Sequence, residues 1–548
     1  MTRSNVRDKA PSDQETVPRG RHGSNTSEGP GEHDGRRHGG GSKTDRRRRR
    51  RRTLRWSATV LAVVILGTAG AGYLYLRHLN GNIRKGELLS GDSKAKKPQP
   101  NAAGQTPMNI LLIGSDSRNS DEDVKLGGAR QNRGTPPHAD VQMLIHLSAD
   151  RKSAAFVSIP RDTRVDIPRC RDPKTGQKYP PVNDLINTSL ARGGPGCTVA
   201  TWESLTKVYI DHWMMVDFAG VVDMADAIGG VDVCVKDNVW DRPTPDAPGG
   251  SGLKLKAGTW TIQHKQALQW LRTRHAWGSD PLRARAQHMY LNSMFRKLKK
   301  QNAFTDGGRL MDLAEAATKS LQVSQELGSV KKLYDLAMQL KSVPTNRITM
   351  TTMPWVPDPA APDAHALPDG ANAEKLWQML RDDVSFDKNG TPDAKKKTGS
   401  AAPAKTASVP AGQLGVLVQN ATGNSTQSPV PLRAKDITGV LAQQGYTRAA
   451  ADTASTGLSE NETLVRYPSA DLEGDAQAVA KALGIPASSV TRSTDVSGVT
   501  VVVGADWRTG TSYPKQSQPR AGDLPSNSDA INGADKGQCM PVYKPYRW

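Results

Sequence analysis

The chain has 548 residues, enough for two or more domains with tails, and it carries 74 Lys and Arg against 54 Asp and Glu, a net charge of +20. Such a positive excess is typical of nucleic-acid binding only where it covers a folded surface. Residues 1–55 alone hold 16 basic and 7 acidic residues, including the seven consecutive arginines 46–52. Nearly half of the excess therefore lies in one tail, which is poor in apolar residues and predicted to be disordered. We expect no nucleic-acid partner.

An uncharged stretch of 21 residues, Trp56–Leu76, follows this tail. It is long enough to cross a bilayer as a helix, and Trp56, Tyr73 and Tyr75 stand near its ends, where interfacial aromatic residues belong. It is longer than the apolar core of a usual signal peptide and begins over fifty residues into the chain, which favours an uncleaved anchor. By the positive-inside rule, the arginines before it predict a single-pass protein of the cell membrane with the tail in the cytoplasm and everything after residue 76 outside. The same arginines would meet the anionic lipid of that membrane.

Four cysteines suit an oxidising exterior. Cys170 and Cys197 flank a segment rich in Pro, Gly and Asn, and we expect a disulfide between them. Cys234 lies in the apolar run VDVCV, so it is either a buried free thiol or the partner of Cys539. The spacing of the four cysteines matches no zinc site.

Residues 77–105 are polar and contain Lys, Gly and Pro, which indicates a linker from membrane to domain. Between 106 and 385, apolar runs alternate with helical patterns, which predicts an α/β domain. Strands are expected within 109–116, 138–148 and 153–168 and at 231–235 and 348–354. Helices are expected at 202–208, 218–228 and through most of 286–342. The apolar faces of 286–342 fit either a slot for a lipid or an ordinary core.

Residues 386–412 consist mainly of Lys, Ala, Pro, Ser and Thr and indicate a second linker. A second small α/β domain is expected at 413–507, because short apolar runs alternate there with two helical patterns. It contains no catalytic constellation. Residues 508–548 are predicted to be a polar tail with little order, apart from an aromatic end at Tyr543, Tyr546 and Trp548.

Four closely spaced arginines mark the block QALQWLRTRHAWGSDPLRARAQHMYL at residues 266–291: Arg272, Arg274, Arg283 and Arg285. We interpret the residues around Trp270 as a short strand, on which Arg272 and Arg274 project to one face. Asp280-Pro281 then predicts a helix start, and in that helix Arg283 and Gln287 share a face. Guanidinium groups beside a helix N-terminus suit a phosphate or pyrophosphate. Solvated surface arginines remain an equally open interpretation.

Two carboxylates stand at neighbouring strand ends. Asp116 ends the first expected strand and Asp140 begins the second, across a Gly-rich loop at 119–137. Paired carboxylates outside the membrane indicate a hard cation such as Mg²⁺, although each residue alone is typical of a turn or cap. Arg161, in SIPRDT, ends the third strand and could face the same spot.

The order of these motifs resembles the LytR-CpsA-Psr family. The motifs are NILLIGSDSR, ADVQML, SIPRDT, GGPGCTVATWESL, IDHWMMVDFAGVVDMADAIGGVDV and ALQWLRTRH followed by SDPLRARAQ. They span about residues 106–353, and residues 413–507 resemble the LytR C-terminal domain of actinobacterial members. The resemblance implies a central mixed sheet flanked by helices, with a hydrophobic pocket for a polyprenyl chain.

It also implies an activity, the transfer of a glycopolymer from a polyprenyl-pyrophosphate carrier onto peptidoglycan during cell wall assembly. The implied partners are the lipid-linked glycan, peptidoglycan and the lipid bilayer, with Mg²⁺ as cofactor. By motif position, the metal carboxylates and the pyrophosphate ligands are Asp116, Asp140, Arg161, Arg272, Arg274 and Arg283, with Gln287 beside them and Arg118 at a frequent position of weaker meaning.

The sequence departs from the family pattern in three places. The loop between Asp116 and Asp140 is longer than in many members, Leu185 in LINTSL stands where many have Lys, and Ala286-Gln287-His288 replaces Arg-Gln-Gln. Arg285 lies on the other helix face and is expected to contribute little. Two alternatives therefore stay open: a hydrolase that passes the same intermediate to water, and a non-catalytic wall-binding or regulatory protein with a partly degenerate site.

Overall fold

The computed structural model describes residues 43–101, 103–115, 137–245, 247–300, 307–389, 406–423, 428–455, 457–460, 462–514, 519–535 and 537–548. The chain falls into two units, Met1–Gly72 and Tyr73–Trp548. Helix α1, Lys43–Asn82, begins in the first unit and ends in the second. Among the described residues it is the one helix long and apolar enough to cross a membrane, with a mean hydropathy of 1.8 inside Arg50–Asn82.

An eight-stranded mixed sheet forms the centre of the second unit, in the order β1-β14-β9-β2-β3-β4-β15-β23. Its strands are β1 Arg84–Gly86, β2 Met108–Ser115, β3 Ala139–Leu147, β4 Ala154–Ser158, β9 His212–Val216, β14 Leu321–Ser324, β15 Ile348–Thr352 and β23 Ile531–Asn532. The central strands are apolar along most of their length because helices cover both faces of the sheet. The predicted mixed sheet flanked by helices is confirmed.

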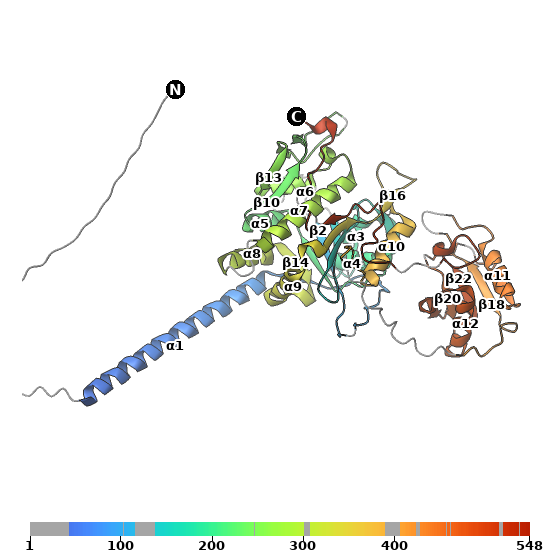
Figure 1. Ribbon diagram of the computed structural model, residues 1–548, viewed down its shortest axis with the longest axis horizontal. Helices are drawn as coiled ribbons and strands as arrows, with labels where there is room; N and C mark the ends of the chain where they lie inside the picture. The colour runs from blue at the N-terminus through green and yellow to red at the C-terminus, as the bar shows by residue number, and fades with distance from the viewer. Residues whose placement is uncertain are drawn as a thin grey trace, which may run out of the picture. The chain divides into compact units, whose positions relative to one another are not determined.

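Helices pack on both faces of this sheet (Figure 1). On one face lie α4, Pro195–Thr206, and α10, Gly370–Arg381, whose rings Trp202 and Trp377 meet with centroids 6.4 Å apart. On the other lie α7, Asp280–Lys300, and α9, Val330–Ser342. Leu291 and Phe295 of α7 pack against buried residues of that sheet face, so this part of 286–342 is core.

A third layer carries the arginine-rich block. Helices α5, Phe218–Ala227, and α6, His264–Arg272, pack with the hairpin of β10, Val231–Val235, and β13, Gly258–Ile262. Its core includes Trp270 and Trp277, whose rings meet edge to face with centroids 5.0 Å apart. The other helices and strands described between residues 84 and 381 are β5 Arg164–Ile167, β6 Cys170–Arg171, β7 Lys178–Tyr179, β8 Val182–Leu185, α3 Ser189–Gly193, β11 Val239–Trp240, β12 Lys254–Leu255, α8 Gly307–Ser320, β16 Trp355–Pro357 and β17 Ala366–Pro368.

The second small domain has its own five-stranded mixed sheet, in the order β19-β18-β22-β20-β21. Its elements are β18 Val416–Asn420, α11 Arg433–Gln443, β19 Ala449–Ala451, β20 Leu464–Tyr467, α12 Glu473–Leu483, β21 Val490–Arg492 and β22 Val499–Val503. Its core is separate from that of the larger sheet, as predicted for a second α/β domain.

Two segments differ from the sequence interpretation. Part of the expected linker 77–105 is structured, because β1 adds to the large sheet beside β14 and Ser90 is buried. The expected polar tail is also structured at its end, since β23 pairs with β15 and Met540 is buried. The sequence pattern of these short, polar segments predicts no strand. They are ordered because they add to the edge of the sheet and pack against its core.

Both pairs of cysteines are joined. Cys170 bonds Cys197, the pairing expected from the loop-like surroundings of both residues. Cys234 bonds Cys539 across 305 residues of sequence, which selects one of the two alternatives left open for it.

Candidate active site

One side of the site is formed by Asp140 and Arg161. Asp140 is the second residue of β3, and Arg161 follows the end of β4. The two strands are antiparallel, so the start of one and the end of the other lie at the same edge. Arg161 Nη1 donates to Asp140 Oδ1 at 2.9 Å, and its Nε lies 3.3 Å from Asp162. Both members of the first pair are about one-fifth exposed, at 21% and 23%, so they remain within reach of a ligand.

The other side carries Arg272 and Arg274, and here the predicted strand is wrong. Arg272 is the last residue of α6, and Arg274 precedes the short 3₁₀ turn η3, His275–Trp277. Ala267, Leu268 and Trp270 are all buried, a helical spacing that the strand interpretation overlooked. Thr273, between the two arginines, is extended and fully buried, whereas Arg274 is exposed.

Helix α7 contributes Arg283 and Gln287, which lie one turn apart on one face. Both are largely buried, at 8% and 7% exposure. Gln287 Nε2 donates to the carbonyl of Leu271 at 3.3 Å, directly before Arg272. Trp270 Nε1 donates to the carbonyl of Ala286 at 3.0 Å. These two contacts fasten the end of α6 to the first turns of α7.

A buried contact joins the two sides. Ser158, the last residue of β4, lies with its Oγ 3.0 Å from His288 Nε2 on α7. Burial, and secondarily the charge of Arg285, lowers the pKa of His288 to about 3, so the ring is neutral. The contact therefore ties the strand end before Arg161 to the helix that bears Arg283. The sequence analysis missed both Ser158 and His288. A polar residue within an apolar run would have indicated a buried hydrogen bond at each position.

Two predicted site residues, Asp116 and Arg118, lie outside the described residues. Ser115, the last residue of β2, is paired with Ala139, the residue before Asp140. Among the residues that the structure describes, no group of three or more His, Cys, Asp or Glu is placed to hold a metal ion. A site built on Asp140 alone would need ligands from elsewhere.

The departures from the family pattern now have a structural context. Ala286 is fully buried in the core between α6 and α7, where its carbonyl accepts from Trp270. His288 is bonded to Ser158. Leu185 ends β8 and is paired with Arg164 of β5. Two of the three replaced positions therefore face packed interior, whereas Gln287 of the same helix contacts the carbonyl of Leu271 on α6.

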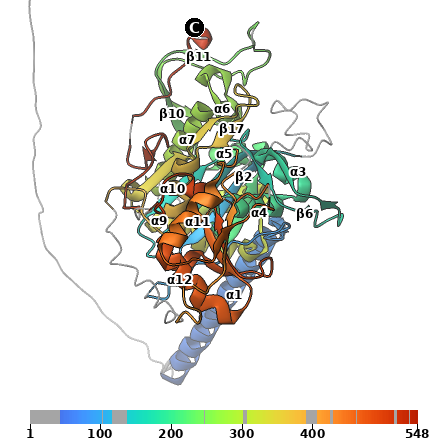
Figure 2. The same cartoon turned by 90° about the vertical axis from the view of Figure 1, so that its right-hand side faces the viewer.

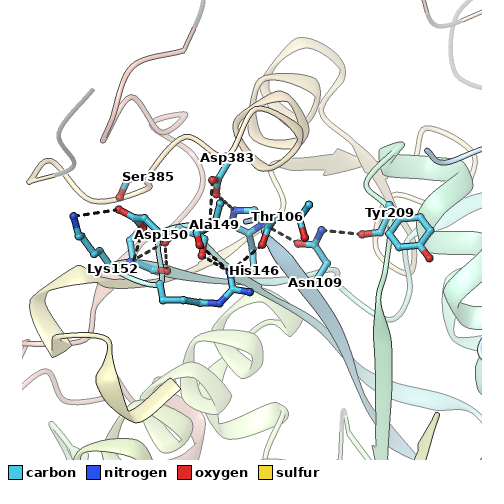
Figure 3. A network of polar contacts seen from close by, with 12 residues as sticks. Thr106, Asn109, His146, Ala149, Asp150, Lys152, Tyr209, Asp383 and Ser385 are labelled. Atoms are coloured by element: carbon cyan, nitrogen blue, oxygen red, sulfur yellow. Dashed lines mark hydrogen bonds and ion pairs between the residues drawn. The ribbon is translucent and has the colours of Figure 1, made fainter. Parts of the chain in front are cut away.

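A second polar cluster lies near the far end of β3 (Figure 3). His146 contacts Asn109 Oδ1 at 2.7 Å and Asp383 Oδ1 at 3.0 Å, and Asp383 Oδ2 accepts from the backbone of Ala149 at 3.1 Å. Six residues of extended chain, roughly 20 Å, separate His146 from Asp140. This cluster binds the segment after α10 to the sheet and is separate from the arginine site.

The sequence profile of the LytR_cpsA_psr family matches residues 75–382, more than half of the chain. The chain belongs to the LytR-CpsA-Psr family. A second profile, described as LytR cell envelope-related transcriptional attenuator, matches residues 413–507, the small domain.

Relatives within the LytR-CpsA-Psr family are moderately similar. Cell wall biosynthesis protein LcpA of Corynebacterium glutamicum is 28% identical over 315 residues, which cover 54% of this chain and 58% of LcpA. TagT of Bacillus subtilis, a polyisoprenyl-teichoic acid–peptidoglycan teichoic acid transferase, is 26% identical over 295 residues, covering 53% of this chain and 84% of TagT. The chain therefore matches less than two thirds of the length of LcpA.

A crystal structure of Bacillus subtilis TagT superposes with a TM-score of 0.38 and 21% sequence identity, covering 55% of this chain and 99% of TagT.

Proposed function

We propose that this protein is a membrane-anchored phosphotransferase that attaches a polyprenyl-pyrophosphate-linked glycopolymer to peptidoglycan on the outer side of the membrane. The observation that carries the proposal is the gathering of arginine-bearing elements. Contacts between β3, β4, α6 and α7 bring together the elements that bear Arg161, Arg272, Arg274 and Arg283. Guanidinium groups match phosphate oxygens in charge and geometry.

The chemistry follows from where charge develops. A sugar hydroxyl of the acceptor attacks the phosphorus that bears the glycan, forming the new phosphodiester bond. The bond from that phosphorus to the bridging oxygen breaks, polyprenyl phosphate leaves, and the hydroxyl proton passes to a base. Negative charge grows on the phosphoryl oxygens and the leaving group, and preorganised arginines stabilise it. Gln287, held against α6, would donate its remaining amide hydrogen to the same oxygens.

Mg²⁺ is proposed as the cofactor, with Asp140 and Asp116 as its protein ligands. The donor chemistry fits, because Mg²⁺ commonly takes one or two carboxylates and completes its shell with water and substrate phosphates. Asp140 is partly exposed at the strand edge, and the chain runs on from Ser115, which is paired with Ala139, directly into Asp116. When bound, the ion would neutralise charge on the pyrophosphate.

Membrane attachment is proposed through α1, whose uncharged stretch begins at Trp56, shortly after the run of seven arginines. The arginines place the N-terminal side in the cytoplasm by the positive-inside rule. The site then lies outside, on the side where peptidoglycan is assembled.

The two alternatives use the same site differently. A hydrolase would deliver water to the same phosphorus, and a non-catalytic protein would bind the carrier without turnover. The buried position of Ala286 argues against a degenerate site, because this residue packs in the core shared by α6 and α7 and is not placed to contact a phosphate.

The deciding experiment incubates the full-length protein in detergent with Mg²⁺, a lipid-linked glycan and peptidoglycan fragments, and identifies the products by mass. A glycan joined to peptidoglycan through a phosphodiester supports the proposal. A free glycan phosphate supports the hydrolase, and unchanged substrate under conditions where the carrier binds supports the non-catalytic protein. Omitting Mg²⁺ or adding a chelator tests the metal separately.

A further inference from the structure

The end of the chain returns to the large domain. Residues 519–548, here called the C-terminal strap, follow the small domain, and β23 within them pairs antiparallel with β15. The Cys234–Cys539 disulfide joins the strap to β10. Its last residues end beside β11, where Asn238 Nδ2 donates to the carbonyl of Trp548 at 2.8 Å (Figure 2). The large domain is therefore built from two stretches of sequence, with the small domain inserted between them.

The strap holds one face of α7. Arg285 donates to the carboxylate of Asp529 and, at 2.9 Å, to Gln538 Oε1. Arg296 donates to the backbone carbonyl of Asp535. Arg285 and Arg296 are eleven residues apart, about three helical turns, so they share a face. Arg283 lies two residues before Arg285, about 200° around the helix, and therefore on the opposite face of α7.

The strap also holds the turn after Arg274. The backbone amide of Tyr543 donates to the carbonyl of Ala276 at 2.8 Å, and the rings of Tyr546 and His275 stack with centroids 6.2 Å apart. Gly278 closes this turn at φ +87°, and a Cβ there would lie 3.3 Å from the ring of Tyr543. The left-handed backbone favours glycine, and a side chain here would also press against the ring of Tyr543.

A chain of hydrogen bonds connects the strap to the end of β4. The carbonyl of Ser528 accepts from the backbone amide of Thr352 at 3.1 Å and from the hydroxyl of Thr351. The Thr352 hydroxyl lies 3.3 Å from Ser158 Oγ, which contacts His288. The strap thus contacts α7 and the turn after α6 directly, and it is linked to the end of β4 through β15.

We infer that the C-terminal strap is a positioning segment for the pyrophosphate site, acting through Arg285 and the turn at Ala276. The inference rests on the proposed function. It changes the expectation for Arg285, whose replacement the sequence interpretation treats as mild. By this inference Arg285 acts on the ligand indirectly, by fixing the position of α7. A misplacement of about 1 Å in a site can lower the reaction rate about a hundredfold.

The test measures binding of magnesium pyrophosphate to the full-length protein in detergent by calorimetry, with thermal unfolding recorded for every variant. Arg285→Ala should weaken binding by about ten- to a hundredfold, and Arg285→Lys should restore much of the loss. Asp529→Asn removes the strap charge and keeps Arg285. Asparagine also tolerates the positive φ of 44° at this position. This variant should weaken binding too.

The matched control is Asn527→Ala. Asn527 belongs to the strap but donates to Asp369 beside α10, at 2.7 Å, away from α7, so its variant should bind as the wild type does. If Asp529→Asn binds pyrophosphate as well as the wild type or better, the contact between Asp529 and Arg285 does not position the site. The inference then fails. The inference also fails if Asn527→Ala loses as much affinity as Arg285→Ala. If Arg272→Ala binds normally, the proposed site itself is wrong, an outcome distinct from failure of the strap alone.

Discussion

At the scale of single residues, the surroundings of Arg272 and Arg274 explain how a helix end replaces the expected strand. Thr273 is extended and buried, and its hydroxyl donates to the carbonyl of Gln269 at 2.7 Å and lies 2.7 Å from Ser251 Oγ. Arg274 is exposed, whereas Arg272 is partly buried. The buried and bonded Thr273 fixes the backbone that carries both arginines.

Replacing Arg272 or Arg274 by Ala should lower the transfer rate about ten- to a hundredfold or more. A charge-assisted contact contributes about 1.5–3 kcal/mol, and about 1.4 kcal/mol is a factor of ten. The measurement is the initial rate of transfer, together with the unfolding temperature, which should change little because Arg274 is exposed. Arg169→Ala, an exposed arginine on the same domain, is the control. Normal transfer by both site variants would contradict the convergent arrangement.

His288 should make the large domain sensitive to acid. An unfolded histidine takes up a proton near pH 6.5, whereas burial keeps the pKa of folded His288 near 3. Between these values the unfolded state binds more protons, so stability falls as the pH drops. From pH 7 to pH 5 this contribution is about 2 kcal/mol. Denaturant unfolding followed by tryptophan fluorescence should show that His288→Gln loses this much less than the wild type. Equal pH dependence in both proteins would refute the assignment.

At the scale of elements, the contact between α6 and α7 decides how the block of arginines is arranged. Trp270 is fully buried and bonds the carbonyl of Ala286, and Gln287 bonds the carbonyl of Leu271. The helices approach closely because residue 286 is small. An arginine at this position, as the family pattern has, would need either a different helix spacing or a buried unpaired charge.

Ala286→Arg should therefore destabilise the protein without raising activity. Overpacking plus a buried charge predicts a loss of about 4 kcal/mol or more, which thermal unfolding and soluble yield would register. Ala371→Arg, an exposed position on α10, is the control and should stay within about 0.5 kcal/mol of the wild type. A folded Ala286→Arg variant with faster transfer would show instead that the natural alanine weakens a phosphate contact.

At the scale of the whole molecule, the candidate membrane helix and the two disulfides both fit the proposed exterior position of the domains. Helix α1 supplies an uncharged span after a basic tail, and all four cysteines are paired in residues that follow it. Disulfides persist in oxidising surroundings, which is consistent with an exterior position of residues 77–548.

Protease added to intact protoplasts should digest residues 77–548 and leave a membrane-embedded N-terminal fragment. The physical reason is the charge difference across the span, since the seven arginines are retained on the cytoplasmic side. Immunoblotting with one antibody to each end of the chain is the measurement. Protection of the C-terminal part in intact protoplasts, with digestion after lysis, would reverse the topology.

The sequence by itself determined the features that depend on local pattern and composition. The apolar runs that became β2, β3, β4 and β15, the uncharged span, and the division into two α/β domains all follow from residues close together in the chain. The order of motifs also sufficed to recognise the family. Hydrophobic periodicity is a local property, and these elements are long enough to express it.

Tertiary structure alone decided the features that depend on distant partners. The block around Trp270 is a helix because its buried side chains face α7 and the β10–β13 hairpin, and the preference of so short a segment is easily overridden. Cys234 is bonded to Cys539, which is distant in the sequence. The polar end of the chain is ordered because it pairs with the edge strand β15 and packs against the core. The candidate site depends on distant partners in the same way, because its arginines lie on separate elements that only packing brings together.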